Sequence, residues 1–158
     1  MNIVGKGIKK IDGMSITTGK PVYTDDLSAK DALVVKILRS PHAYAKIKDI
    51  DTSKAEMVDG VECVLTYKDV PKSQFTLAGQ TYPEPSPYDR LILEDVVRYV
   101  GDEVAIVAAI DEKTAIKAMN LIKVKYEVLT PVLDFEEAIG NKTMVHDEDR
   151  HCNFDIGM

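Results

Sequence analysis

The residues best suited to chemistry lie near the C-terminal end, where positions 146–152 gather two histidines, three acidic side chains and a cysteine. Imidazole, thiolate and carboxylate groups are the ligands that zinc prefers in proteins. The spacing, however, matches no known site geometry, and no expected helix or strand holds these side chains in place. We therefore interpret the segment as an acidic, solvated linker. The alternative is a small metalloenzyme that uses His146, His151 and Cys152.

Two other patterns superficially indicate catalysis or nucleotide binding. Ser40 and His42 flank a proline, which could suggest a hydroxyl activated by a neighbouring base. Side chains two residues apart across a proline turn rarely point at each other, so a structural turn is the better interpretation. The run Gly5-Lys6-Gly7-Ile8-Lys9-Lys10 lacks the third glycine of a dinucleotide fingerprint, and no strand precedes it. We interpret this run as part of a flexible arm.

Composition excludes several classes of function. The net charge of −6 and the lack of a basic patch interleaved with aromatic residues argue against nucleic-acid binding. No apolar run approaches the roughly 18 residues of a membrane span, so we expect a cytoplasmic protein with no membrane partner. The two cysteines, Cys63 and Cys152, are too few for an iron–sulfur cluster, which needs about four ligands. We expect no catalytic, cofactor-binding or metal-binding residue in this chain.

The elements that would position any site are organised around residues 95–109. Two apolar runs, 96–100 and 103–110, flank Gly101-Asp102. A two-residue Gly-Asp connection between such runs predicts a β-hairpin, because glycine tolerates the positive φ of a tight turn. The second run is apolar at both alternating positions, which predicts a central strand covered on both faces.

Further strands are predicted from β-branched or alternating residues at 33–39, 43–51, 61–66 and 124–129. In the strand over 61–66, alternation places Val61, Cys63 and Leu65 on one face. Cys63 is therefore predicted to be a small core residue rather than a reactive thiol.

Helices are predicted where capping residues precede a helical period. Residues 51–53 begin a short helix that ends before Gly60, Asp111 caps a longer helix over 112–123, and a final helical turn or two spans 134–139. The longer helix carries an apolar stripe at i, i+3, i+4 and i+7, formed by Ala115, Ala118, Met119 and Ile122.

Residues 71–90 interrupt the regular pattern. They contain four prolines and no helical or strand period. A loop of this length without structure of its own is usually either functional or disordered. Alternating prolines favour an extended conformation that docks on a surface at low entropic cost. Partner docking and simple disorder are equal alternatives for this loop.

Six motifs occur together in an informative order and spacing. They are Thr18-Gly19-Lys20-Pro21-Val22-Tyr23-Thr24-Asp25-Asp26, Leu38-Arg39-Ser40-Pro41-His42-Ala43, Ile50-Asp51-Thr52-Ser53-Lys54-Ala55, Asp59-Gly60-Val61, Val97-Arg98-Tyr99-Val100-Gly101-Asp102-Glu103-Val104-Ala105 and Val124-Lys125-Tyr126-Glu127-Val128-Leu129. Together they resemble the N-terminal domain of the molybdopterin-binding large subunit of xanthine dehydrogenase and aldehyde oxidase. Departures are small: Lys10-Ile11 stands where an arginine is frequent, and Asp102 replaces a frequent glutamate.

The resemblance implies an α+β fold called the α/β hammerhead, a mixed, mainly antiparallel sheet with two main helices packed on it. It also implies three parts of the chain. These are an extended N-terminal arm at 1–24, the hammerhead domain at 25–140, and a linker at 141–158 toward a molybdenum-cofactor-binding domain absent from this chain.

Enzymes of this family hydroxylate a purine or an aldehyde with oxygen from water. A molybdenum–pterin cofactor takes the electrons, which pass through iron–sulfur clusters to FAD. The resemblance therefore implies a scaffold domain of a molybdenum hydroxylase that is inactive alone and holds no cofactor itself. The implied partners are the downstream molybdenum-binding domains and the iron–sulfur and FAD subunits or domains. The alternative is a free-standing protein-binding module that shares the fold and uses the loop at 71–90.

Overall fold

The computed structural model describes residues 4–27, 29–75, 90–139 and 141–145. The chain divides into two units, Met1–Ala32 and Leu33–Met158, which we call the arm and the body. The predicted arm at 1–24 lies within the first unit. The loop tip at 76–89 and the ligand-rich run at 146–152 lie outside the described residues.

The arm contains two short helices that the sequence analysis did not predict. These are α1 (Gly13–Thr17) and the 3-10 helix η1 (Thr24–Leu27). In α1 the Thr17 hydroxyl donates to the Gly13 carbonyl at 2.9 Å, and the Thr18 hydroxyl donates to the Met14 carbonyl at 2.7 Å. Hydroxyl-to-backbone bonds of this local kind favour turns and helix ends over long helices, and α1 is only five residues long.

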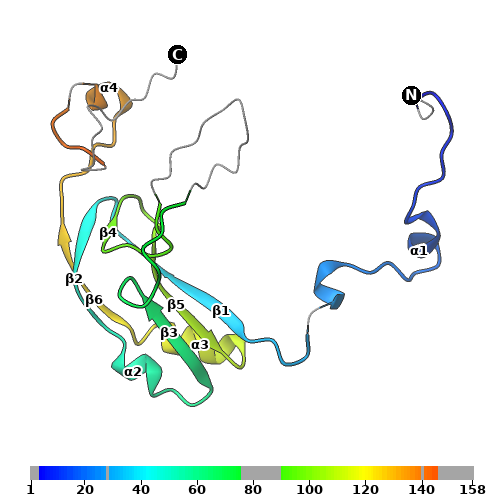
Figure 1. The fold of residues 1–158 in the computed structure, drawn as a ribbon, viewed down its shortest axis with the longest axis horizontal. Helices are drawn as coiled ribbons and strands as arrows, with labels where there is room; N and C mark the ends of the chain where they lie inside the picture. Colours follow the sequence, from blue (N-terminus) through cyan, green and yellow to red (C-terminus); the bar gives the residue numbers. More distant parts are fainter. Residues whose placement is uncertain (1–3, 28, 76–89, 140, 146–158) are drawn as a thin grey trace. The chain divides into compact units, whose positions relative to one another are not determined.

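The body is built from two three-stranded sheets whose strand pairs are all antiparallel (Figure 1). One sheet has the order β1 (Val34–Arg39), β5 (Glu103–Ala109), β3 (Val61–Thr66). The other has the order β4 (Val96–Val97), β2 (Ala45–Asp51), β6 (Lys123–Val128). The predicted α+β class is confirmed, and the strands divide between two sheets rather than forming one.

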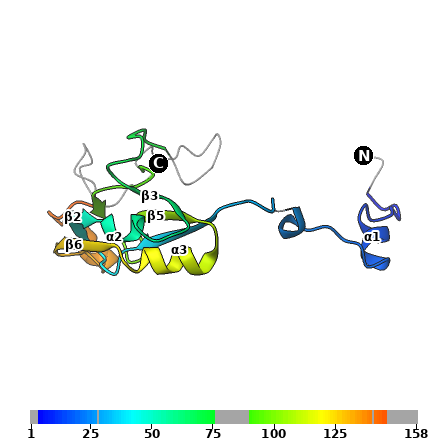
Figure 2. The same ribbon diagram turned by 90° about the horizontal axis from the view of Figure 1, so that it is seen from below.

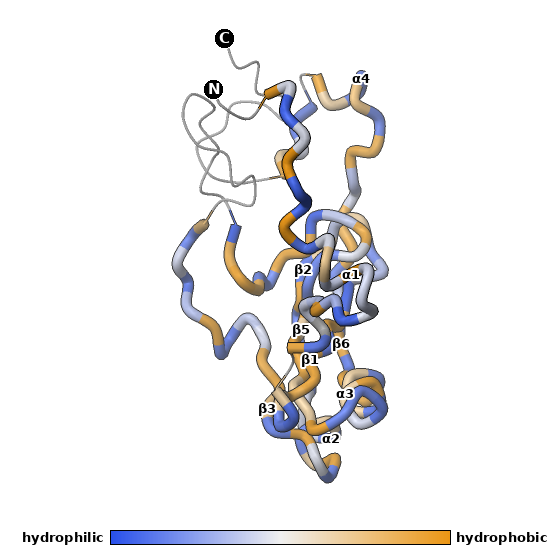
Figure 3. Tube along the Cα trace, turned by 90° about the vertical axis from the view of Figure 1, so that its right-hand side faces the viewer, coloured by the Kyte–Doolittle hydropathy of each residue, from blue (hydrophilic) through white to orange (hydrophobic). Residues whose placement is uncertain are grey.

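Strand β5 is central and covered on both faces, as predicted. Its buried residues include Val104, Ala105, Val107 and Ala108, which point to both sides of the sheet. Helix α3 (Glu112–Met119) packs against β1 and β5 on one side (Figure 2). The region around β5 is coloured as hydrophobic in Figure 3. One core joins the two sheets, because residues of β2, β4 and β5 belong to the same buried cluster.

The body helices begin where the capping residues predicted them. The Asp111 carboxylate accepts a hydrogen bond from the Thr114 amide at 2.7 Å and so caps α3. The buried stripe is confirmed at Ala115 and Ala118, although α3 ends at Met119 rather than at residue 123. The short helices α2 (Ser53–Glu56) and α4 (Phe135–Ala138) occupy the two other predicted places.

Gly60 follows α2 and requires the absence of a side chain. Its φ is +87°, and a Cβ there would lie 2.8 Å from Cδ1 of Ile110. The Ile110 amide donates to the Gly60 carbonyl at 2.9 Å. The entry to β3 is therefore held close against the exit of β5.

The predicted hairpin at Gly101-Asp102 is wrong, although a turn is present. Strand β4 pairs with β2 in one sheet, while β5 pairs with β1 and β3 in the other. The Asp102 amide donates to the Tyr99 carbonyl at 3.2 Å, and Gly101 has a φ of +98°. The turn therefore carries the chain from one sheet to the other, because each flanking run finds a different partner strand.

The predicted burial of Cys63 is also wrong, because its side chain is exposed. Val61 pairs with Ala109 and Cys63 with Ala108, so two steps along β3 match one step along β5. This irregularity is a β-bulge, which interrupts the alternation of faces. Val61 and Val64 pack against the core instead.

Candidate functional site

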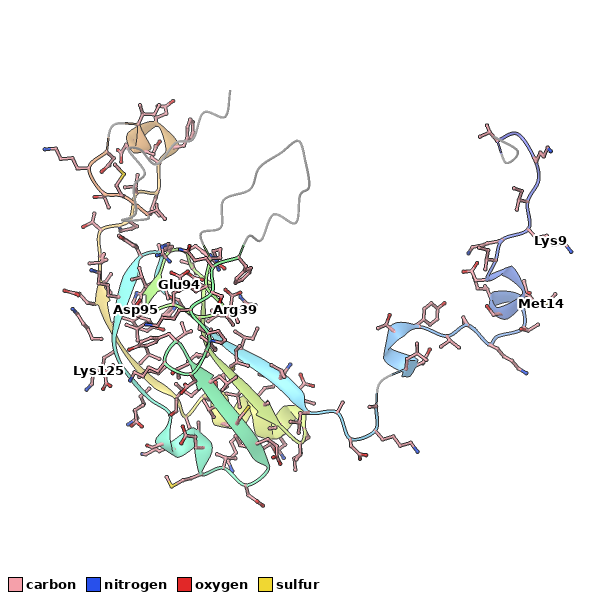
Figure 4. All side chains as sticks on the ribbon, in the orientation of Figure 1. Lys9, Met14, Arg39, Glu94, Asp95 and Lys125 are labelled. Carbon is pink, nitrogen blue, oxygen red and sulfur yellow. The ribbon has the colours of Figure 1, made fainter. Side chains whose placement is uncertain are left out.

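A cluster of charged side chains surrounds the turn at Gly101. Arg39 comes from the end of β1, and Asp102 and Glu103 come from the start of β5. The backbone of Arg90 pairs with that of Phe75 in an isolated antiparallel bridge. Arg39 and Glu94 lie in the same part of the body in Figure 4. We call Arg39, Arg90, Tyr99, Asp102 and Glu103 the turn cluster.

Arg90 is the centre of the turn cluster, with a side chain only 18% exposed. Its Nη2 lies 3.3 Å from Asp102 Oδ1 and 3.3 Å from Glu103 Oε2. The guanidinium also lies 5.4 Å from the centroid of the Tyr99 ring. Burial acts to lower the pKa of Arg90, but the Tyr99 hydrogen bond and the charges of Asp102 and Glu103 raise it overall. Arg90 is therefore a fixed cation.

The Asp102 carboxylate ties the turn together, with a side chain 9% exposed. Its Oδ2 accepts from the Arg98 amide at 2.8 Å, and its Oδ1 accepts from the Glu103 amide at 3.1 Å. Together with the Arg90 contact, these bonds satisfy a buried charge that would otherwise be costly. Asp102 therefore stabilises the crossing from one sheet to the other.

Glu103 completes the balance of charge in the turn cluster. Its Oε1 lies 3.0 Å from Arg39 Nη1, which also donates to the Gly101 carbonyl at 2.7 Å. Burial acts to raise the pKa of Glu103, but its own backbone amide, Arg39 and Tyr99 lower it overall. Both acids of the cluster thus face cations. The cluster is therefore suited to stabilising the conformation of the turn rather than to exchanging protons.

An apolar hollow of about 200 Å³ lies beside the turn cluster. It is lined by residues 43–44, 98–100, 131–133 and 143–145. The Tyr44 hydroxyl donates to the Met144 carbonyl at 3.2 Å, and Arg98 Nε donates to the Val145 carbonyl at 3.0 Å. Arg98 is also ion-paired with Glu94. The charge on this wall is thereby compensated, and the hollow is suited to an apolar group.

The residues singled out in the sequence do not assemble into a reactive site in the described part of the chain. The Ser40 hydroxyl lies 3.0 Å from both the backbone amide and the carbonyl of His42. The His42 ring packs edge-on against Tyr126, with centroids 4.8 Å apart. Among the described residues, no group of three or more histidine, cysteine or acidic side chains is placed to hold a metal ion. None of the helices within the described ranges is both long and apolar enough to cross a bilayer.

Sequence reasoning missed the turn cluster. Its members are separated by up to 64 residues, as in the pair between Arg39 and Glu103. No spacing rule connects such positions. The adjacent acids at 102 and 103, directly after a turn glycine, were the only local signal.

Comparisons with known proteins identify the family. Residues 18–130 match the model described as "Aldehyde oxidase and xanthine dehydrogenase, a/b hammerhead domain". The chain belongs to this family. The predicted resemblance is therefore confirmed, and residues 18–130 are matched to the hammerhead domain.

Relatives of the hammerhead are much longer proteins. The "Probable hypoxanthine oxidase XdhD" of Escherichia coli K12 is 44% identical over 149 residues, which are 94% of this chain and 16% of the relative. A probable xanthine dehydrogenase subunit from Bacillus subtilis is 38% identical over 87% of this chain and 18% of the relative. The chain thus spans about a sixth of the length of the relatives that it matches.

Solved structures lead to the same family. Quinoline 2-oxidoreductase from Pseudomonas putida 86 superposes with a TM-score of 0.76 at 32% identity, covering 90% of this chain and 18% of that one. The aldehyde oxidoreductase of Desulfovibrio desulfuricans gives a TM-score of 0.76 at 30% identity, over 92% and 17% of the two chains. The chain is therefore a domain of xanthine dehydrogenase and aldehyde oxidase-type molybdenum enzymes.

The two cysteines of this chain do not fit an iron–sulfur cluster. An iron–sulfur cluster requires about four thiolate ligands, whereas the chain has two cysteines. Cys63 is exposed on an edge strand of its sheet. No chemical step can be derived from the described residues.

Proposed function

We propose that this hammerhead is a scaffold and interaction domain, inactive alone, of a cytoplasmic molybdenum hydroxylase. The complete enzyme would hydroxylate a purine or an aldehyde with oxygen from water, using a molybdenum–pterin cofactor, iron–sulfur clusters and FAD. The names of the Escherichia coli and Bacillus subtilis relatives refer to hypoxanthine and xanthine, which favours a purine. Within this proposal, residues 25–140 form the hammerhead and 141–158 link it to the molybdenum-binding domains.

The proposal is supported by the contrast between the buried centre of the body and its exposed apolar end. Its centre is rigid, because β5 is covered on both faces and the turn cluster holds the crossing between sheets. Its end near α4 instead leaves large apolar side chains in solvent, namely Val128, Leu133, Phe135 and Ile139. Exposed apolar side chains that group in one part of a molecule are typical of sites of protein–protein contact. A rigid block with an apolar end is suited to fixing a neighbouring domain in place.

The first test is purification of the chain from a host supplied with molybdenum. The proposal expects no bound molybdenum by elemental analysis and no turnover of hypoxanthine. Stoichiometric molybdenum, or measurable turnover, would contradict it.

The second test grafts this chain into the Escherichia coli relative in place of its own matching 149 residues. The proposal expects the chimera to retain molybdenum and turnover, whereas deletion of the same residues removes both. A deletion variant that keeps its molybdenum and its activity would show that the domain is not a necessary scaffold.

A further inference from the structure

We infer that the apolar hollow between β2, the Gly101 turn and the segment before α4 receives an apolar side chain from the remaining part of the same enzyme. This inference rests on the proposed function and adds to it the surface and the chemistry of the contact. The occupant is a bulky aliphatic or aromatic residue contributed by the molybdenum-binding region.

The walls of the hollow select for an uncharged occupant. Among the described residues of these walls, Arg98 alone carries a formal charge, and its guanidinium is already engaged by Glu94 and by the Val145 carbonyl. The Tyr44 hydroxyl is likewise engaged by the Met144 carbonyl. A charged partner would therefore lose its hydration without gaining a counter-ion, whereas an apolar side chain would gain from burial.

The rim of the hollow carries exposed apolar side chains. Val100 is 66% exposed and Leu133 is 79% exposed, and both residues line the hollow. Phe135 continues the apolar surface from Leu133 into α4. A central pocket surrounded by apolar contacts that exclude water is the arrangement found at the anchor residues of protein interfaces.

The size of the surface favours a tethered occupant over a second copy of the chain. A stable complex between separate proteins buries about 1,200–2,000 Å² in total and uses roughly 20–30 residues on each side, whereas 11 described residues line this hollow. A region of the same polypeptide docks at a high effective concentration and needs much less area. The relatives supply such a region, since the matched part is 16% of the Escherichia coli protein.

The test measures thiol protection in the full-length enzyme that contains this chain. Leu133→Cys and Val100→Cys place a thiol at the rim, and Met57→Cys at the end of α2 is the matched control because Met57 is 76% exposed. Each variant is labelled with a maleimide, and peptide mass spectrometry gives the labelling rate at the new thiol. A covered thiol reacts only on local opening, so we expect the rim thiols to react at least about tenfold more slowly than the control.

Equal rates at the rim and at Met57→Cys, whether fast or slow, overturn the inference. If the protection disappears when the enzyme is diluted to monomers, the hollow is covered by a second copy, and this result overturns the inference as well.

A Leu133→Asp variant of the full-length enzyme provides the second measurement, with Met57→Asp as its control. We expect loss of molybdenum only in the rim variant, and equal retention in both contradicts the inference. Failure of the proposed function is a separate result, since it would appear as molybdenum or turnover in the isolated chain.

Discussion

The arm and the body use the same kinds of residue to opposite effect. In the body, the valines of β5 are fully buried, and the charged residues beside them are paired. In the arm, the apolar side chains of Val4, Ile8, Ile11 and Met14 are exposed, and none of the described side chains is buried. Figure 4 shows Lys9 and Met14 projecting from the arm. A segment's content of apolar residues therefore does not by itself decide whether its side chains are buried.

The five residues of α1 illustrate the difference. An isolated helix shorter than about 12–15 residues is marginal in water. Helix α3 has only eight residues but is stabilised by its buried stripe against β1 and β5. Four predictions test this comparison of the two regions, from the largest effect to the smallest.

The largest effect is expected from a charge in β5. Val107 is fully buried, so Val107→Asp should lower the free energy of unfolding by more than about 4 kcal/mol. Ile11 in the arm is 104% exposed. The substitution Ile11→Asp should therefore change the free energy of unfolding by less than about 0.5 kcal/mol. Urea unfolding monitored by circular dichroism measures both values. Similar losses at the two positions would contradict the division between body and arm.

The second prediction concerns the turn cluster. Asp102→Ala leaves the partly buried Arg90 without one of its two acids and removes an acceptor from two backbone amides. We expect a loss of about 3 kcal/mol. The control is Asp49→Ala, whose partner Lys125 lies 3.2 Å away on an exposed surface, and its loss should stay below about 1 kcal/mol. If the two losses are equal in urea unfolding, the turn cluster does not hold the crossing.

The third prediction tests the backbone of the turn. Gly101 has a φ of +98°, so Gly101→Val should cost roughly 1–3 kcal/mol through backbone strain. Gly7 lies in the arm, where a Cβ would meet nothing within 4 Å and φ is not in the positive range. Gly7→Val is therefore the control and should leave the melting temperature of the body unchanged. An unchanged melting temperature for Gly101→Val would disprove the assignment of the turn.

The smallest effect is the contribution of Glu103 to acid stability. Burial acts to raise its folded pKa, but its own amide, Arg39 and Tyr99 outweigh burial and hold that pKa below the ordinary value of 4.5. The resulting stabilisation is fully present above pH 4.5 and is lost as the pH falls through the lower folded pKa. Urea unfolding between about pH 6 and pH 3 should therefore show a shallower fall in stability for Glu103→Gln than for the parent. A Glu103→Gln profile identical to that of the parent would refute the assignment.

The sequence predicted those parts of the body that are determined by residues close together in the chain. The double apolar pattern of residues 104–109 identified the central strand, and Asp111 identified the start of α3. It could not predict which strand pairs with Val96–Val97, because a turn signal fixes the reversal of the chain but not its partner. Cys63 was misplaced for a related reason, since a bulge depends on the register with β5 and leaves no signature in the residues themselves.

The candidate site was harder to predict from the sequence than the fold. The contacts of Arg90 with Asp102 and Glu103 join residues 12 and 13 positions apart, and no spacing rule predicts them. The hollow joins four separate segments of the chain. Only the exposed apolar residues around α4 could have been suspected beforehand, because residues 128–139 contain more apolar side chains than one short helix can bury.

The bridge between Phe75 and Arg90 has a consequence for the connection between these two residues. Two backbone hydrogen bonds join these residues, and the Arg90 side chain is tied to β5, so the stretch between them begins and ends at fixed points. Insertions there would leave the sheets untouched, since each doubling of loop length costs only about 0.6 kcal/mol. A longer connection between Phe75 and Arg90 would therefore add surface without altering the two sheets.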